Sequence, residues 1–84
     1  MTRKTMIWID TPYHGYLKVN VKNKELLESK FEPSRYSFIQ NGHWYFEEDV
    51  DAIRFMKKIW KKNWRDIFER LPVEHHKIIY WEPK

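Results

Sequence analysis

Alternation of hydrophobic and polar positions predicts two β-strands near the start of the chain. Residues 5–10 are rich in β-branched and aromatic side chains, and they are followed by Pro12, which cannot donate a backbone hydrogen bond to a sheet. In residues 16–21, Leu17 and Val19 alternate with polar neighbours, as in a strand with one buried face. We expect the two strands to pair as a hairpin.

A short helix is predicted over residues 23–30. Asn23 can cap its amino end, because an Asn side-chain oxygen accepts a hydrogen bond from the exposed amides of a first helical turn. Leu26 and Leu27 are expected to point inward, and residues 31–34 end the helix.

The clearest local pattern is a β-hairpin over residues 36–47. Asn41 and Gly42 supply the two positive φ angles that a type I′ turn requires. This turn pairs position 40 with 43, 39 with 44, 38 with 45 and 37 with 46. One face of the hairpin then carries Ser37, Ile39, Trp44 and Phe46, and the other carries Tyr36, Phe38, Tyr45 and Glu47.

From position 49 the hydrophobic period changes to that of a helix, which Pro72 ends. Its apolar stripe, with spacings of three or four residues, consists of Ile53, Met56, Trp60, Trp64, Ile67 and Leu71. Residues 77–81 are expected to form a last short strand.

This order of elements predicts an α+β fold. Strand, strand, short helix, strand, strand, long helix and strand are typical of a mostly antiparallel sheet packed against one long amphipathic helix. A chain of 84 residues has room for one hydrophobic core, so residues 1–84 are expected to form a single domain. The spatial order of the strands does not follow from the pattern.

Composition limits the chemistry of this domain. No cysteine is present, which excludes disulfides, thiolate nucleophiles and cysteine-bound zinc, whereas aromatic residues make up 18% of the chain and must dominate the core. Met6 to Ile9 form an apolar run far too short for a signal peptide or a membrane span, so a cytoplasmic protein without membrane contact is expected.

Three segments together resemble small uncharacterised proteins of bacteriophages and prophages. They are residues 14–19 (His-Gly-Tyr-Leu-Lys-Val), 34–37 (Ser-Arg-Tyr-Ser) and 45–52 (Tyr-Phe-Glu-Glu-Asp-Val-Asp-Ala). The resemblance spans roughly residues 12–55 and implies a phage context, hence the cytoplasm of a bacterial host. It brings no catalytic residue with it, and the basic, Trp-rich residues 57–64 are not part of it.

Acidic and histidine residues are assigned structural roles. The acids at the start of the long helix, where carboxylates favour the free amides and the dipole, are Glu47, Glu48, Asp49 and Asp51. The histidines, at 14, 43, 75 and 76, lack metal-ligand spacing, and His14 is expected to fix a turn beside Gly15. We expect no metal, no cofactor and no enzyme. The best enzymatic alternative would pair His14 with a carboxylate from residues 47–51.

The long helix also carries a basic stripe. Taking about 100° per residue, six cations fall within about 140° of its circumference. They are Arg54, Lys57, Lys58, Lys61, Lys62 and Arg65. A solvated helix face is the plain interpretation. The single sign of the charges favours a docking surface for phosphates or an acidic protein.

The outer face of the hairpin is unusually aromatic. Tyr36, Phe38 and Tyr45 require a cover, and an exposed patch of this kind typically marks a binding surface. Either the helix at residues 23–30 covers them, or a partner or second copy does, as in a twofold homodimer.

These features predict a small non-enzymatic binding protein. We expect it to be phage-encoded and to dock on a host protein that it modulates, as an accessory or counter-defence factor. The alternative is nucleic-acid binding through the basic stripe.

Overall fold

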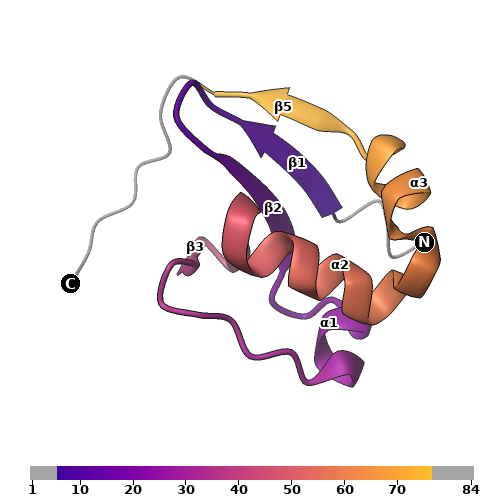
Figure 1. Cartoon of the computed structure of the whole chain (residues 1–84). Coiled ribbons are helices and arrows are strands. Elements are labelled where there is room, and N and C mark those ends of the chain that lie inside the picture. Colours follow the sequence, from indigo (N-terminus) through magenta and orange to yellow (C-terminus); the bar gives the residue numbers. More distant parts are fainter. Residues whose placement is uncertain (1–5, 77–84) are drawn as a thin grey trace.

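Five strands form one sheet in the computed structural model, which describes residues 6–76 (Figure 1). They are β1 (Met6–Asp10), β2 (Gly15–Asn20), β3 (Phe38–Gln40), β4 (His43–Glu47) and β5 (Val73–His75). Their order across the sheet is β3-β4-β2-β1-β5. Only the β1–β5 neighbours run parallel. The expected α+β fold with a mostly antiparallel sheet is confirmed in this respect.

Both predicted hairpins are present. β1 and β2 pair antiparallel, with Asp10 opposite Gly15 next to the turn. In the second hairpin the turn residues Asn41 and Gly42 have φ angles of 52° and 78°, which are the positive values expected there. The predicted register is confirmed at three positions, where Phe38 pairs with Tyr45, Ile39 with Trp44 and Gln40 with His43.

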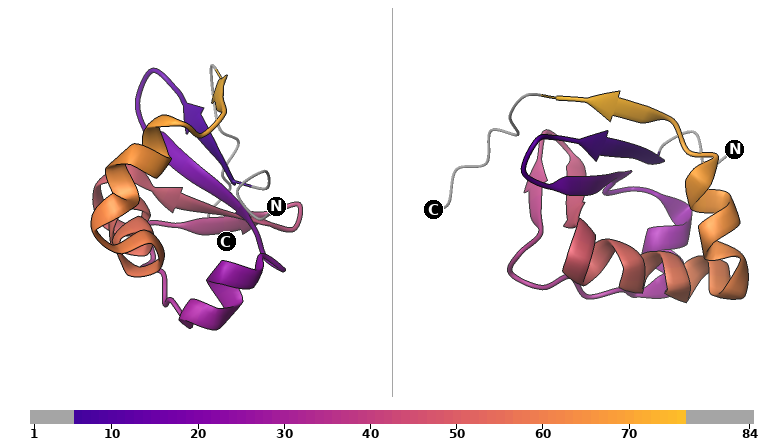
Figure 2. Two further views of the ribbon diagram at one scale, coloured as in Figure 1. Left: turned by 90° about the vertical axis from the view of Figure 1, so that its right-hand side faces the viewer. Right: turned by 45° about the horizontal axis from the view of Figure 1, so that its top comes forward.

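The helical segments lie on one face of the sheet (Figure 2). They are α1 (Lys24–Ser29), a π-helical turn (Glu48–Ala52), α2 (Ile53–Trp60), a 3₁₀ turn (Lys61–Asn63) and α3 (Trp64–Glu69). Asn23 caps α1 as predicted, because its Oδ1 accepts a hydrogen bond from the Leu26 amide at 2.9 Å.

The predicted long helical segment is present from Glu48 to Glu69, but it is not one uninterrupted helix. Lys61 has φ 53° and ψ −135°, which ends α2, and α3 then runs at a steep angle to α2 (Figure 2). Tertiary contacts on both sides of Lys61 favour the turn. Trp60 is buried and donates from Nε1 to Glu25 Oε2 at 3.2 Å. Beyond the turn, the Phe68 ring packs edge-on against Trp8 of β1, with ring centroids 4.9 Å apart.

The core lies between the sheet and the helices. Its fully buried large side chains come from β1, β2, β4 and α2, and they are Met6, Leu17, Val19, Phe46, Phe55 and Met56. Phe55 is fully buried although it lies outside the predicted stripe, whereas Ile53, predicted inward, is 36% exposed. Phe55, Met56 and Trp60 are the buried residues of α2, so its buried face is centred nearer Phe55 than the predicted stripe, and Ile53 lies at the edge of that face.

Two further predictions of burial are wrong. Leu27 is 60% exposed, because α1 has fewer than two full turns and Leu26 alone takes the inward position. Ile39 is 55% exposed, because β3 lies at the edge of the sheet, beyond the buried cluster.

A short strand that the sequence pattern did not predict follows α3. β5 begins at Val73, directly after Pro72, and pairs with β1. The strand predicted at residues 77–81 lies outside the described residues. Among residues 6–76, no helix has the length and apolar character that crossing a bilayer requires.

Candidate functional site

Five of the six predicted cations form an exposed surface on α2, the 3₁₀ turn and α3. We call this surface the cationic face, and it consists of Lys57, Lys58, Lys61, Lys62 and Arg65. None of the five forms an ion pair with an acid within residues 6–76. The turn at Lys61 spreads the cations over two helix directions, so they do not follow one straight stripe as predicted.

Arg54, the sixth predicted cation, has a structural role. Its Nη2 donates to Asp51 Oδ1 at 2.9 Å and to the Glu32 carbonyl at 3.3 Å. Its guanidinium also lies over the Phe31 ring, 4.8 Å from the centroid. Because these contacts bind the Arg54 guanidinium to other residues of the protein, we do not include Arg54 in the cationic face.

Asp51 lies in the first helical turn as predicted, but it is fully buried and its side chain binds the preceding loop. Its Oδ2 accepts from the Ser34 amide and hydroxyl, each at 2.8 Å, and from the Ser37 hydroxyl. Burial raises the pKa of Asp51, but hydrogen bonds from Ser37, Arg54 and Ser34 outweigh burial and hold that pKa below its usual value. Asp51 therefore ties the loop before β3 to α2 as a buried carboxylate.

The Trp64 ring lies between a cation of α2 and a cation of α3 in the cationic face. The Lys57 ammonium lies 5.9 Å from the centre of its ring and the Arg65 guanidinium 5.2 Å. Both distances suit cation–π attraction, which limits the freedom of these two long side chains. The face thus has a half-buried aromatic centre with exposed cations around it.

A further cation, Lys30, joins this surface and was not predicted. An open cavity of about 660 Å³ is lined by Lys30, Phe31, Glu32, Arg54, Lys57 and Lys58. Lys30 caps the carboxyl end of α1 with φ 54°, so only the packing of α1 beside α2 brings it here. A helical wheel of residues 49–71 could not have included it.

The predicted aromatic surface is present in part. Phe38 and Tyr45 stack with ring centroids 5.0 Å apart and an interplanar angle of 6°, and Tyr16 packs edge-on against both. Tyr36 lies outside this stack, is 57% exposed and has the Arg35 guanidinium over its ring. Tyr16 was not predicted as a member, although its alternation with buried Leu17 places it on this face.

The short helix does not cover the aromatic stack. Leu26 of α1 belongs to the core on the opposite face of the sheet, together with Phe46 and Val19. The expectation that residues 23–30 cover Phe38 and Tyr45 is therefore wrong.

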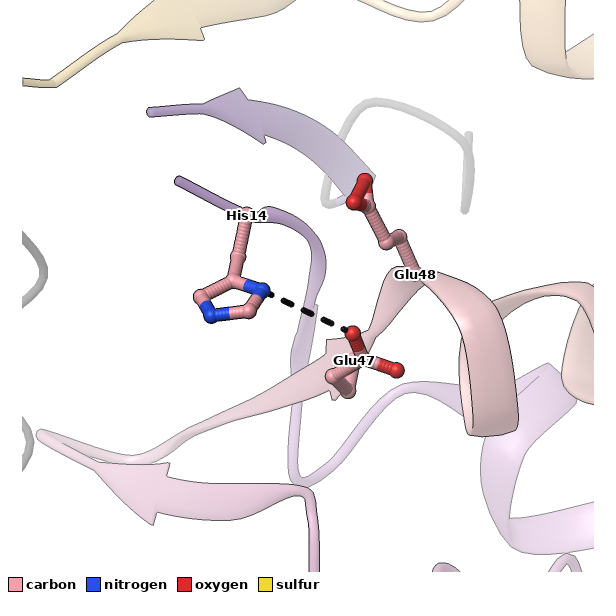
Figure 3. Close-up of side chains that lie close together, drawn as sticks. All are labelled: His14, Glu47 and Glu48. Atoms are coloured by element: carbon pink, nitrogen blue, oxygen red, sulfur yellow. Dashed lines mark ion pairs between the residues drawn. The ribbon is translucent and has the colours of Figure 1, made fainter. Parts of the chain in front are cut away.

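A third cluster combines His14, Glu47 and Glu48 (Figure 3). His14 lies in the turn between β1 and β2, Glu47 ends β4, and Glu48 begins the π-helical turn. His14 Nδ1 lies 3.9 Å from Glu47 Oε2. The pairing of His14 with a carboxylate from residues 47–51 is thus present in the structure, because β2 and β4 are neighbours and Tyr16 pairs with Glu47.

The backbone of His14, rather than its ring, fixes the turn. Its amide donates to Thr11 Oγ1 at 2.9 Å, and its carbonyl accepts from the Thr11 hydroxyl at 2.6 Å. Glu47 serves as the predicted helix-start acid, since its Oε1 accepts from the amides of Asp49 and Val50. Burial raises the pKa of Tyr16, and the negative charges of Glu47 and Glu48 raise it further.

Comparison of the chain with known proteins gives no relative from which a role could be transferred. What the protein does must be inferred from its own residues. No family model, no curated protein and no solved structure matches this chain.

Proposed function

We propose that the protein is a small non-enzymatic binding protein, encoded by a bacteriophage or prophage, that docks on a host protein in the bacterial cytoplasm and modulates it. The phage context is supported by the resemblance of residues 12–55 to small phage proteins. Docking is supported by the cationic face, and this is the observation that carries the proposal.

The charge pattern specifies the chemistry of the partner. From Ala52 to Arg65 the chain contains six cations and no acid, and five of those cations remain unpaired within residues 6–76. A protein partner that covers this face is expected to offer carboxylates, because like charges at an interface cost several kcal/mol. The host protein is therefore expected to present an acidic surface.

The cavity beside the cationic face adds a place for one acidic side chain. Lys30, Lys57 and Lys58 lie around it, and Phe31 supplies an apolar wall. A carboxylate seated there would replace water around several ammonium groups at once. Interfaces of this type associate faster at low salt, because the charges steer the encounter.

A charge-reversal experiment tests the proposal. Lys58→Glu with Lys62→Glu reverses two exposed members of the face that make no cation–π contact. Lys22→Glu with Arg35→Glu is the matched control, because each pair of substitutions lowers the net charge by four, from +4 to 0. Both control positions are exposed and lie outside α2 and α3.

The immobilised wild-type protein is used to capture partners from bacterial lysate, and each captured protein is then titrated with all three forms. We expect the face variant to bind at least about tenfold more weakly, because reversal replaces attraction by repulsion across a charged interface. The control variant should bind like the wild type. Equal binding by the face variant and the wild type, or failure to capture any partner, contradicts the proposal.

A second candidate function, nucleic-acid binding, is favoured by the placement of Trp64 between Lys57 and Arg65. An aromatic ring among cations can stack on a base while the cations contact phosphates. If all five members of the face contacted phosphates, the logarithm of the binding constant on duplex DNA would fall with the logarithm of salt at a slope of about −4.5. Mobility-shift titration with duplex and single-stranded DNA and RNA at low salt distinguishes this function from protein docking.

A further inference from the structure

The cluster of His14, Glu47 and Glu48 brings three metal-ligand side chains to one place from three different elements (Figure 3). One donor atom from each residue lies within 4.8 Å of the other two. Within this group His14 Nδ1 and Glu47 Oε2 are 3.9 Å apart. The cluster lies at the turn end of the β1–β2 hairpin and outside the cationic face.

Each of the three residues is held by a contact that leaves a donor atom available. Glu47 uses Oε1 to cap the helical turn, so Oε2 remains directed toward His14. Glu48 uses Oε2 to accept from the Gly15 amide at 3.0 Å, and no hydrogen bond to its Oε1 is formed within residues 6–76. His14 is fixed through its backbone, so its ring nitrogens are not used by the turn.

Gly15 allows Glu48 to approach the hairpin. A Cβ at this position would lie only 2.9 Å from Glu48 Oε2 and 2.4 Å from the Trp8 ring. The close contact therefore requires glycine, and it draws Glu48 toward His14. Glu48 is half-buried and forms no ion pair within the described residues, so its negative charge has no cation beside it.

We propose that His14, Glu47 and Glu48 bind a divalent transition-metal ion, with Zn²⁺ the best match. Imidazole together with carboxylates suits Zn²⁺, whereas Ca²⁺ and Mg²⁺ prefer ligand sets made only of oxygen. The two carboxylates carry the charge that balances a dication. Three protein ligands leave the fourth tetrahedral position to water or to a side chain of a partner.

The distances allow this coordination after small side-chain movements. Donor atoms about 2.1 Å from a tetrahedral Zn²⁺ ion lie about 3.4 Å from one another. The His14–Glu47 separation of 3.9 Å must therefore shorten by about 0.5 Å, and the other donor separations, which lie within 4.8 Å, by up to about 1.4 Å. The His14 side chain is 57% exposed, so its ring can turn into place without disturbing the core.

Titration calorimetry of the whole protein with ZnCl₂ tests the proposal, and it needs neither a docking partner nor an activity. We expect one Zn²⁺ per chain with affinity in the micromolar range or tighter. His14→Ala and Glu48→Gln should each weaken binding by about tenfold or more. Both substitutions are compatible with folding, because His14 is exposed and a Gln oxygen can still accept from the Gly15 amide.

His75→Ala with His76→Ala is the matched control, since these exposed histidines lie beside Asp10 and Glu74 and are a second place where Zn²⁺ could attach. This variant should bind like the wild type. The visible spectrum of the Co²⁺-substituted protein should also show tetrahedral bands that the His14→Ala variant lacks. Absence of binding up to millimolar Zn²⁺, unchanged affinity in the His14→Ala variant, or loss of binding in the control variant would each overturn the proposal.

Discussion

Replacing Asp51 by Asn tests whether this buried carboxylate organises the loop before β3. The change keeps the shape of the side chain but removes its charge. Asp51 is fully buried and accepts hydrogen bonds from Ser34 and Ser37 through one oxygen and from Arg54 through the other. In the variant, an amide oxygen can still accept from the two serines, but the amide nitrogen then faces the guanidinium of Arg54, which also donates.

The magnitude follows from these bonds. A hydrogen bond to a charged group contributes about 1.5–3 kcal/mol and a neutral one about 0.5–1.5 kcal/mol, so each of the three serine bonds loses about 1 kcal/mol. Arg54 is 55% exposed, so loss of its ion pair adds only about 0.2–1 kcal/mol. Because these contributions are not additive, we expect a total loss of about 3 kcal/mol. That is a large part of the roughly 4–13 kcal/mol by which a domain of this size is stable.

Urea unfolding followed by tryptophan fluorescence measures the effect. Asp49→Asn is the control, because Asp49 is exposed and lies at the same helix start, and its loss should cost at most about 1 kcal/mol. The stability that depends on the Asp51 charge should vary with pH. The pKa of Asp51 is lowered on folding, so this contribution is complete above the unfolded pKa of about 3.9 and disappears as the pH falls through the folded pKa.

The difference in unfolding free energy between the wild type and the Asp51→Asn variant should therefore shrink between pH 7 and pH values below about 3.9. The other carboxyl groups titrate in both proteins and cancel in this difference. A variant no less stable than Asp49→Asn at pH 7, or a difference that does not change with pH, would refute the reasoning.

Three further substitutions have expected outcomes. Gly15→Ala should lower the stability by about 1–3 kcal/mol in thermal unfolding, because the new Cβ meets the Trp8 ring at 2.4 Å; an unchanged melting temperature would contradict the contact. Asn23→Ala should cost about 1 kcal/mol through loss of the α1 cap, and Asn23→Ser should restore most of it in the same assay. Phe38→Ser with Tyr45→Ser should convert a dimer to a monomer in light scattering, since the two stacked rings lie on the sheet face opposite the core; a monomeric wild type contradicts the dimer.

The sequence predicted the residues of the cationic face only in part. The six basic positions were predicted as a set, because charge and helical period can be counted directly in the sequence. Arg54 nevertheless has a structural role and does not belong to the cationic face, since its guanidinium reaches the buried Asp51. Lys30 was missed because its place beside α2 depends on how α1 packs.

The cluster of His14, Glu47 and Glu48 was also predicted only in part. The sequence suggested that His14 could meet a carboxylate from residues 47–51, but it did not predict which one or the joint approach of Glu47 and Glu48. Their meeting depends on the pairing of β2 with β4, two strands separated by α1 and β3 along the chain. Strand order was left open because a period of two identifies strands and faces, not neighbours.

The sequence by itself determined the local features of this protein. The Asn41-Gly42 turn, the Asn23 cap and the alternation in β2 depend on residues within a few positions of one another, and each is present as predicted. Tertiary contacts decided the rest. The turn at Lys61, the burial of Asp51 and the order of the strands arise between residues distant in the chain, because packing selects among backbone conformations that local propensity leaves close in free energy.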